Sequence, residues 1–197
     1  PAGDTGASLM PFALLTAEDR ARLPGGLEDA YPVTRLQAGM LFHSESASGG
    51  ALYHDVFSHH LRGPLDLGAL QQELDALVQR HAVLRTSFDL AAFSEPLQLV
   101  QGQARWPLVS GDLAHLPSLA QEEWLDRFVH DEARRTFDWT RPPQVRAYVH
   151  RRGPEKFQFT LALHHAIIDG WSLASLLTEL FVHYLARIGR GEPPAAT

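Results

Sequence analysis

Two adjacent histidines, His164 and His165, stand just before an Asp-Gly pair formed by Asp169 and Gly170. Imidazole suits general acid–base chemistry, because its unperturbed pKa of about 6.5 lies near neutral pH. If a helix begins directly after the Asp-Gly turn, its first backbone N–H groups can stabilise a developing oxyanion. A base beside such donors is the arrangement used for acyl transfer, so this pattern points to that class of chemistry.

The residues before the histidines alternate as in a β-strand, where neighbouring side chains point to opposite faces of the sheet. If residues 157–165 form one strand, His165 ends an apolar row and His164 ends a small or polar row. The apolar row is Phe157, Phe159, Leu161 and Leu163, and the other row is Gln158, Thr160 and Ala162. This separation predicts that His165 is the working residue and His164 its supporting neighbour. It also argues against a metal site, since adjacent strand residues cannot easily aim both rings at one ion.

Each of these residues also has a structural interpretation. A buried histidine is more often a hydrogen-bonded core residue than a catalyst, and the pair taken alone favours that interpretation. Asp169 is suited to cap the following helix or turn, whatever the site does. The spacing HHxxxDG shifts the balance, because a chance match in a chain of this length is expected on the order of once in a few thousand sequences.

The pair must be positioned by the helices and strands around it. Apolar residues at helical spacing predict helices, with a short polar one first, at residues 15–26, 34–45, 65–84, 118–137 and 172–185. Alternating segments predict strands at residues 51–63, 84–90, 96–102 and, as a hairpin turning at RRGPEK, 145–165. This mixed order favours an α/β (α+β) fold, a mixed β-sheet with helices packed on it.

The overall composition narrows the function classes. The chain has 197 residues, of which 45% are hydrophobic and 20% charged, as in a soluble globular domain. A net charge of -6 argues against a nucleic-acid partner, because phosphate backbones select basic surfaces. No apolar stretch approaches the roughly 20 residues that span a bilayer, so no membrane partner is expected. The absence of cysteine excludes disulfides and thiolate chemistry and suits a cytoplasmic protein.

Three motifs in order give a resemblance to a known family. The signature HHxxxDG is complete, and Trp171 and Ser172 follow it. Two earlier stretches, Asp29–His43 (DAYPVTRLQAGMLFH) and Arg80–Phe88 (RHAVLRTSF), resemble the first and second core motifs of the same family. The sequence thus resembles the condensation domains of nonribosomal peptide synthetases, which belong to the chloramphenicol-acetyltransferase-like superfamily.

This resemblance implies a reaction and roles for the residues. The family joins a donor acyl or peptidyl thioester to the amine of an acceptor aminoacyl thioester. His165 is implied to face a central tunnel, either as general base or as a group that positions the amine. Asp169 is implied to be structural and paired with an arginine, either Arg85 or one outside this chain. Gly170 is implied to keep the tunnel open and let the backbone approach the substrate.

The resemblance also predicts the organisation and partners of the chain. Residues 1–27 are expected to be a leader, residues 28–190 the N-terminal lobe of a two-lobed domain, and residues 191–197 the start of the interlobe linker. The isolated lobe is then expected to be inactive. Expected partners are the donor and acceptor carrier domains, adjacent synthetase domains and the C-terminal lobe. No cofactor is expected to bind directly, because the carriers supply the phosphopantetheine, and no metal is expected.

Other functions of the same superfamily stay open. An epimerization domain shares HHxxxDG, although Trp171 after Asp-Gly favours condensation. A coenzyme-A-dependent acyltransferase usually needs only HxxxDG and fits the first two motifs poorly. A non-catalytic recruitment domain would typically carry altered histidines, and a heterocyclization domain would replace the signature with DxxxxD.

Overall fold

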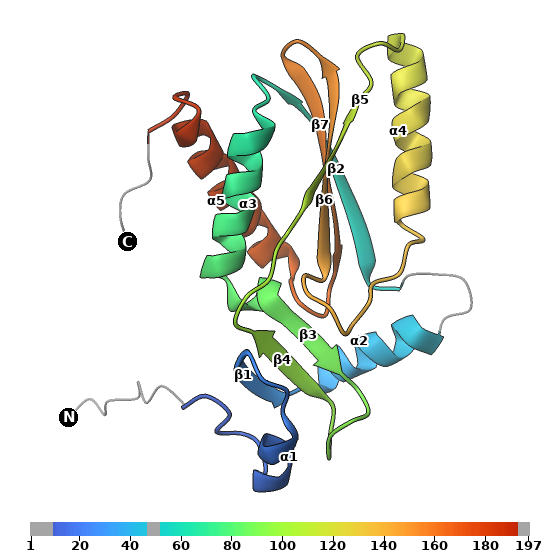
Figure 1. The fold of residues 1–197 in the computed structure, drawn as a ribbon. Helices are drawn as coiled ribbons and strands as arrows, with labels where there is room; N and C mark the ends of the chain where they lie inside the picture. The colour runs from blue at the N-terminus through green and yellow to red at the C-terminus, as the bar shows by residue number, and fades with distance from the viewer. Residues whose placement is uncertain (1–9, 47–51, 193–197) are drawn as a thin grey trace, which may run out of the picture.

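The computed structural model describes residues 10–46 and 52–192, and its strands form two sheets (Figure 1). The larger sheet has the order β2-β7-β6-β5, with β2 His54–Arg62, β7 Lys156–His164, β6 Val145–Gly153 and β5 Leu108–Asp112. The smaller sheet has the order β1-β4-β3, with β1 Leu27–Pro32, β4 Leu97–Gln101 and β3 Thr86–Asp89. All strand pairs are antiparallel except β5 and β6. The predicted mixed fold is confirmed.

Helices cover both faces of the larger sheet (Figure 1). On one side lie α3, Leu67–Arg80, and α5, Gly170–Arg187, while α4, Ser118–Glu132, lies on the other. The remaining helical elements are α1, Ala17–Arg22, α2, Arg35–Ser46, and a 3-10 turn, η1, at Ala82–Arg85. Side-chain caps begin α3 and α5, and the Asp66 carboxylate accepts the Ala69 N–H at 2.9 Å at the start of α3.

The central strand β7 places the main core. Its residues from Phe157 to His164 are buried, because helices and neighbouring strands cover both faces. Phe157, Phe159, Leu161 and Leu163 pack into one large cluster with α3 and α5. The intervening residues lie on the α4 side, where Trp124 of α4 contacts the ring of His150 in β6. The alternation predicted for this strand is therefore observed.

Part of the predicted leader packs against the smaller sheet. Phe12, Leu15 and Leu23 contact an apolar cluster that contains Ala30 and Leu97. These contacts lie within the described residues, whereas residues 1–9 and 193–197 lie outside them. The boundaries of the domain at residues 27 and 190 stay a prediction.

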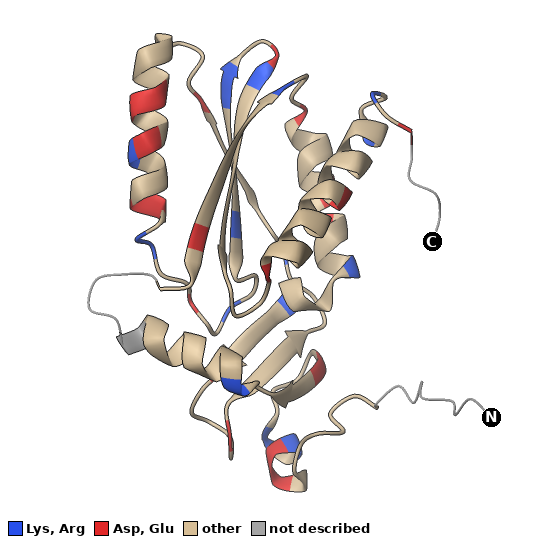
Figure 2. Ribbon diagram, turned by 180° about the vertical axis from the view of Figure 1, so that it is seen from behind, with Lys and Arg blue, Asp and Glu red and all other residues tan. Residues whose placement is uncertain are grey.

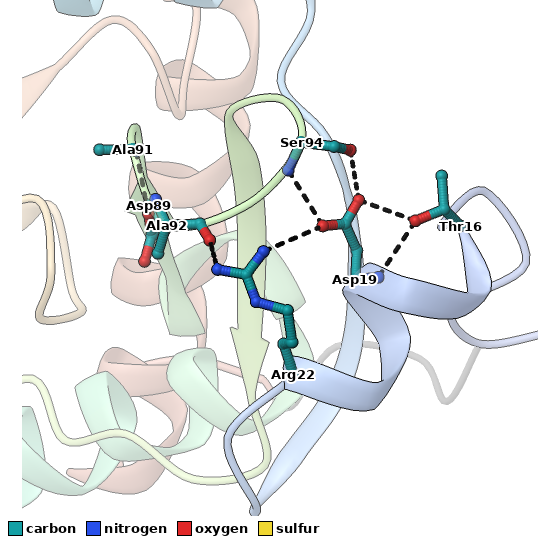
Figure 3. Close-up of polar contacts among 7 residues, drawn as sticks. All are labelled: Thr16, Asp19, Arg22, Asp89, Ala91, Ala92 and Ser94. Atoms are coloured by element: carbon teal, nitrogen blue, oxygen red, sulfur yellow. Dashed lines mark hydrogen bonds and ion pairs between the residues drawn. The ribbon is translucent and has the colours of Figure 1, made fainter.

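A buried carboxylate ties α1 to the loop after β3 (Figure 3). Asp19 accepts hydrogen bonds from the backbone N–H and the hydroxyl of Ser94, and from the hydroxyl of Thr16. These hydrogen bonds hold the pKa of Asp19 below its usual value. Arg22, close to the same carboxylate, donates to the Ala92 carbonyl.

Several local features differ from the expectations, and the helix predicted at residues 65–84 ends at Arg80 and is followed by η1. The helix predicted at residues 118–137 ends at Glu132, and Arg146 donates to the carbonyls of Arg135 and Thr136 beyond this end. Strands β1 and β5 were not predicted: each is short, and neither has a clear apolar alternation.

In Figure 2 the acidic and basic segments are interspersed along the ribbon.

Candidate functional site

The two histidines of the signature lie in different environments at the end of β7. His164 is paired in register with His54 of β2, on the α4 side. The backbone N–H of His165 donates to the Tyr53 carbonyl at 2.9 Å and continues the β2–β7 ladder by one residue. Its ring meets the carboxylate of Asp55, which belongs to the α3–α5 side because Asp55 pairs with Leu163. The pleat of the sheet thus directs the two imidazoles to opposite faces.

His164 is a buried, neutral imidazole. Its Nδ1 accepts the Ala166 N–H at 3.1 Å, so the ring proton is on Nε2. Nε2 lies 3.2 Å from the Leu52 carbonyl, to which it donates, and 2.9 Å from the Ser44 hydroxyl. Burial lowers the pKa of His164 to about 4. Because Nε2 already carries a proton, His164 cannot act as a base toward Ser44, and a serine hydrolase dyad is excluded.

His165 is partly exposed, and both of its ring nitrogens contact oxygen atoms. Its side chain is 28% exposed. Nδ1 lies 3.1 Å from the Ile168 carbonyl, and Nε2 lies 2.8 Å from the Asp55 carboxylate. The contact with Ile168 lies within the turn that connects β7 to α5, so this turn orients the ring.

Asp169 begins α5 as its N-cap. Its carboxylate accepts the Ser172 N–H at 2.8 Å, and its own carbonyl accepts the Leu173 N–H. Hydrogen bonds from Ser172 lower the pKa of Asp169. The N–H of Ser172 is therefore occupied by Asp169 and is not free to stabilise an oxyanion.

Arg85 is not the partner of Asp169. Its guanidinium is buried and donates to the carbonyls of Val78 and Gln101, at 3.0 and 2.7 Å, and to the carboxylate of Glu28. Arg85 thus joins η1 and the end of α3 to the smaller sheet, which is a structural role. Within residues 10–46 and 52–192, Asp169 forms no ion pair.

Several residues that hold the site were missed from the sequence. Gln37 of α2 donates to the Ala166 carbonyl at 2.9 Å, in the turn after the histidines. The Trp139 ring meets His164 edge-on at 4.6 Å, and Ser44 reaches the same histidine. Of these residues, only Gln37 and Ser44 could have been singled out from the sequence, because Gln37 belongs to the first motif and Ser44 directly follows it. Asp55 lay in a predicted strand without any motif to single it out.

A cavity of about 540 Å³ lies between η1 and the first half of α5. Trp171 and Ser172 line it, together with residues of the second motif such as Val83 and Leu84. Trp171 is 86% exposed, and His165 is not among the lining residues. The residues that follow the signature thus adjoin a surface cavity, separate from the contact of His165 with Asp55.

Neither a metal cluster nor a membrane helix is found in the described part of the chain. No group of three or more His, Asp or Glu side chains there could hold a metal ion. No described helix is both long and apolar enough to cross a bilayer.

Substitution of Gly170 separates folding from function. Gly170 is exposed, its φ is not positive, and an added Cβ would meet no atom within 4 Å. We expect Gly170→Ala to keep or slightly raise the melting temperature of the chain, because the added Cβ meets no atom and alanine is the better helix former by up to about 1 kcal/mol. If Gly170 lines the tunnel, amide formation by the complete domain should fall about tenfold or more, because a methyl group displaces the substrate. Thermal unfolding and product yield test the two parts, and full activity would contradict the tunnel role.

Three buried histidines predict a pH dependence of stability. Burial lowers the pKa of His54, His150 and His164 to about 4 in each case. Between pH 6.5 and about 4 the unfolded chain binds protons that the folded chain does not, so the free energy of unfolding decreases as the pH is lowered. Each histidine should contribute about 1–3 kcal/mol to this loss. Asp19, whose pKa is lowered, loses its contribution to stability only at lower pH, where its carboxylate becomes protonated.

Urea unfolding of the chain at pH 7.5 and pH 5 measures this loss. His150→Phe should make the pH dependence shallower, because it removes one of the three titrating imidazoles. The phenyl ring can take the place of the imidazole against its aromatic neighbours Trp124 and Phe128. A free energy of unfolding that stays constant between the two pH values would contradict the prediction.

The arrangement of the two sheets is that of known condensation domains. The starter condensation domain of rhizomide synthetase RzmA superposes with a TM-score of 0.75 at 14% identity, covering 86% of this chain and 42% of that one. The first condensation domain of the calcium-dependent antibiotic synthetase gives a TM-score of 0.70 at 21% identity, covering 87% and 42%. These likenesses show the fold.

The family follows from the sequence comparison. The family model described as the condensation domain matches residues 27–196, and this chain belongs to that family. The AMB antimetabolite synthetase AmbE of Pseudomonas aeruginosa is 42% identical over 181 residues, covering 90% of this chain and 8% of the synthetase. Tyrocidine synthase 3 of Brevibacillus parabrevis is 32% identical over 163 residues, covering 83% of this chain and 2% of the synthase. The chain therefore spans a small part of these relatives.

Proposed function

We propose that this chain is the N-terminal lobe of a condensation domain that joins a donor acyl or peptidyl thioester to an acceptor aminoacyl thioester. The observation that carries this proposal is the accessible ring of His165, oriented by the Ile168 carbonyl beside the buried, neutral His164. Such a pair places one imidazole at the reaction and uses the other to hold the strand end.

The proposed chemistry is a nucleophilic substitution at the donor carbonyl. The acceptor nitrogen attacks this carbon, the C–N bond forms, and the C–S bond of the donor thioester breaks. One proton leaves the nitrogen and one proton reaches the departing thiolate. Nε2 of His165 either takes the nitrogen's proton as a general base or hydrogen-bonds the amine and the tetrahedral intermediate.

The proposed partners follow from the thioesters. Donor and acceptor arrive on the phosphopantetheine arms of two carrier domains, and the C-terminal lobe closes the site. The exposed Trp171 and the cavity beside it lie next to the signature and are available for contact with these partners. The lobe alone is proposed to be inactive.

The test uses the complete domain with a donor-loaded and an acceptor-loaded carrier protein in deuterated water. Mass spectrometry of the released product should show the amide, and the 197-residue chain alone should form none. Deuterium at the donor α-carbon without amide would instead assign epimerization. Binding of both carriers without either product would assign a recruitment domain.

A further inference from the structure

An acidic side chain stands on the apolar face of the larger sheet beside His165. Asp55 of β2 pairs in register with Leu163 of β7, and the next pair on this face is Phe57 with Leu161. A carboxylate at the end of an apolar row is costly unless it is hydrated or paired. Asp55 is 53% exposed, and its carboxylate lies 2.8 Å from Nε2 of His165. The strand thus presents a negative charge at the reactive nitrogen.

The hydrogen bonds around His165 call for positive charge. Both ring nitrogens face oxygen acceptors, the Ile168 carbonyl at Nδ1 and the Asp55 carboxylate at Nε2. A neutral ring has one N–H group and can satisfy only one of them, whereas a protonated ring satisfies both. Among the residues that the structure describes, no Lys or Arg forms an ion pair with Asp55. Because the Asp55 side chain is 53% exposed beside Nε2, a cationic N–H donor that approaches this nitrogen can also reach the carboxylate.

We propose that Asp55 binds the α-ammonium group of the acceptor and delivers it to Nε2 of His165. This inference rests on the proposed function, which supplies an acceptor with a primary amine. A free α-amino group has a pKa of about 7.7–8.0, so much of it arrives as a cation at neutral pH. The carboxylate holds that cation by a charge-assisted hydrogen bond, and no covalent bond forms at this subsite. The ammonium then gives one proton to water, and the neutral nitrogen that remains attacks the donor carbonyl.

The proposal predicts a preference for a cation over a neutral group of the same size. Two unreactive probes test it on the complete domain: an aminoacyl amide of pantetheine and its α-hydroxy counterpart, which has no positive charge. We expect the amine probe to bind the wild type about tenfold more tightly than the hydroxy probe, as one charge-assisted hydrogen bond allows. Isothermal titration calorimetry measures both dissociation constants.

Substitutions at Asp55 then test the carboxylate itself. Asp55→Asn should weaken the amine probe about tenfold and leave the hydroxy probe unchanged, and Asp55→Glu should retain part of the preference. The matched control is Asp112→Asn, which removes one exposed carboxylate from the edge strand β5. That control should keep the wild-type preference. With a soluble aminoacyl thioester as acceptor, Asp55→Asn should raise KM more than it lowers kcat.

The outcomes separate this proposal from the proposed function. Equal binding of the two probes to the wild type would overturn the proposal, and so would an equal loss of both probes in Asp55→Asn. The second result would mean that Asp55 only supports the fold. A wild type that prefers the amine probe but forms no amide from loaded carriers would leave the ammonium subsite standing and overturn the proposed function.

Discussion

Replacement of His165 with alanine is expected to lower amide formation by the complete domain about 10²–10⁴-fold, the range for a positioned acid–base group. Its Nε2 is the imidazole nitrogen that faces the accessible carboxylate of Asp55. His164 cannot replace it, because its Nδ1 accepts the Ala166 N–H and its Nε2 faces the Leu52 carbonyl. The measurement is the initial rate of amide formation from two loaded carriers, at saturating acceptor.

The loss should occur in a folded protein. His165 is partly exposed and ends the β2–β7 ladder through its backbone, which alanine retains. The melting temperature should therefore stay near that of the wild type. His115→Ala, at an exposed position in the turn before α4, is the matched control and should keep full activity. Wild-type rates in the His165 variant would refute the assignment of His165.

Replacement of His164 with alanine is expected to reduce the free energy of unfolding by about 2–4 kcal/mol. The substitution leaves the Ala166 N–H without its acceptor and opens a cavity beside Trp139. It also removes the contact with Ser44, and with it a link between α2 and the end of β7. Urea unfolding of the chain at pH 7.5 measures the loss.

The effect of this variant on the reaction should be indirect. At a temperature where the variant stays folded, the complete domain should retain more activity than the His165 variant. His164→Gln keeps polar atoms at the site and should recover part of the stability. A fully stable His164→Ala domain with less activity than His165→Ala would show that the roles of the two histidines are reversed.

Local patterns predicted much of the fold. The hairpin of β6 and β7, with its turn in RRGPEK, and the helix after the Asp-Gly pair are found where they were expected. On that last helix Leu173, Leu176, Leu180 and Tyr184 are buried, at the spacing of one helical face. These elements are predictable because their apolar period matches the geometry of a strand or a helix.

Contacts between distant segments were not predictable in the same way. Asp55 and His165 meet across 110 positions of sequence, and Gln37 reaches Ala166 across 129. Arg85 illustrates the opposite error, because it lies in a motif but pairs with Glu28 and not with Asp169. Which charged groups meet depends on how β2 and the smaller sheet are placed beside the signature, and no local pattern encodes that placement.

The amino-acid pattern thus established the family, the order of the main elements and the separation of His164 from His165, because strand alternation depends on neighbours in the chain. The folded structure established what each imidazole contacts. Burial lowers the pKa of His164 and keeps its ring neutral, and the register of β2 against β7 brings a carboxylate to His165. Protonation and hydrogen bonding depend on the groups packed around a side chain, and those groups come from strands and helices far apart in the sequence.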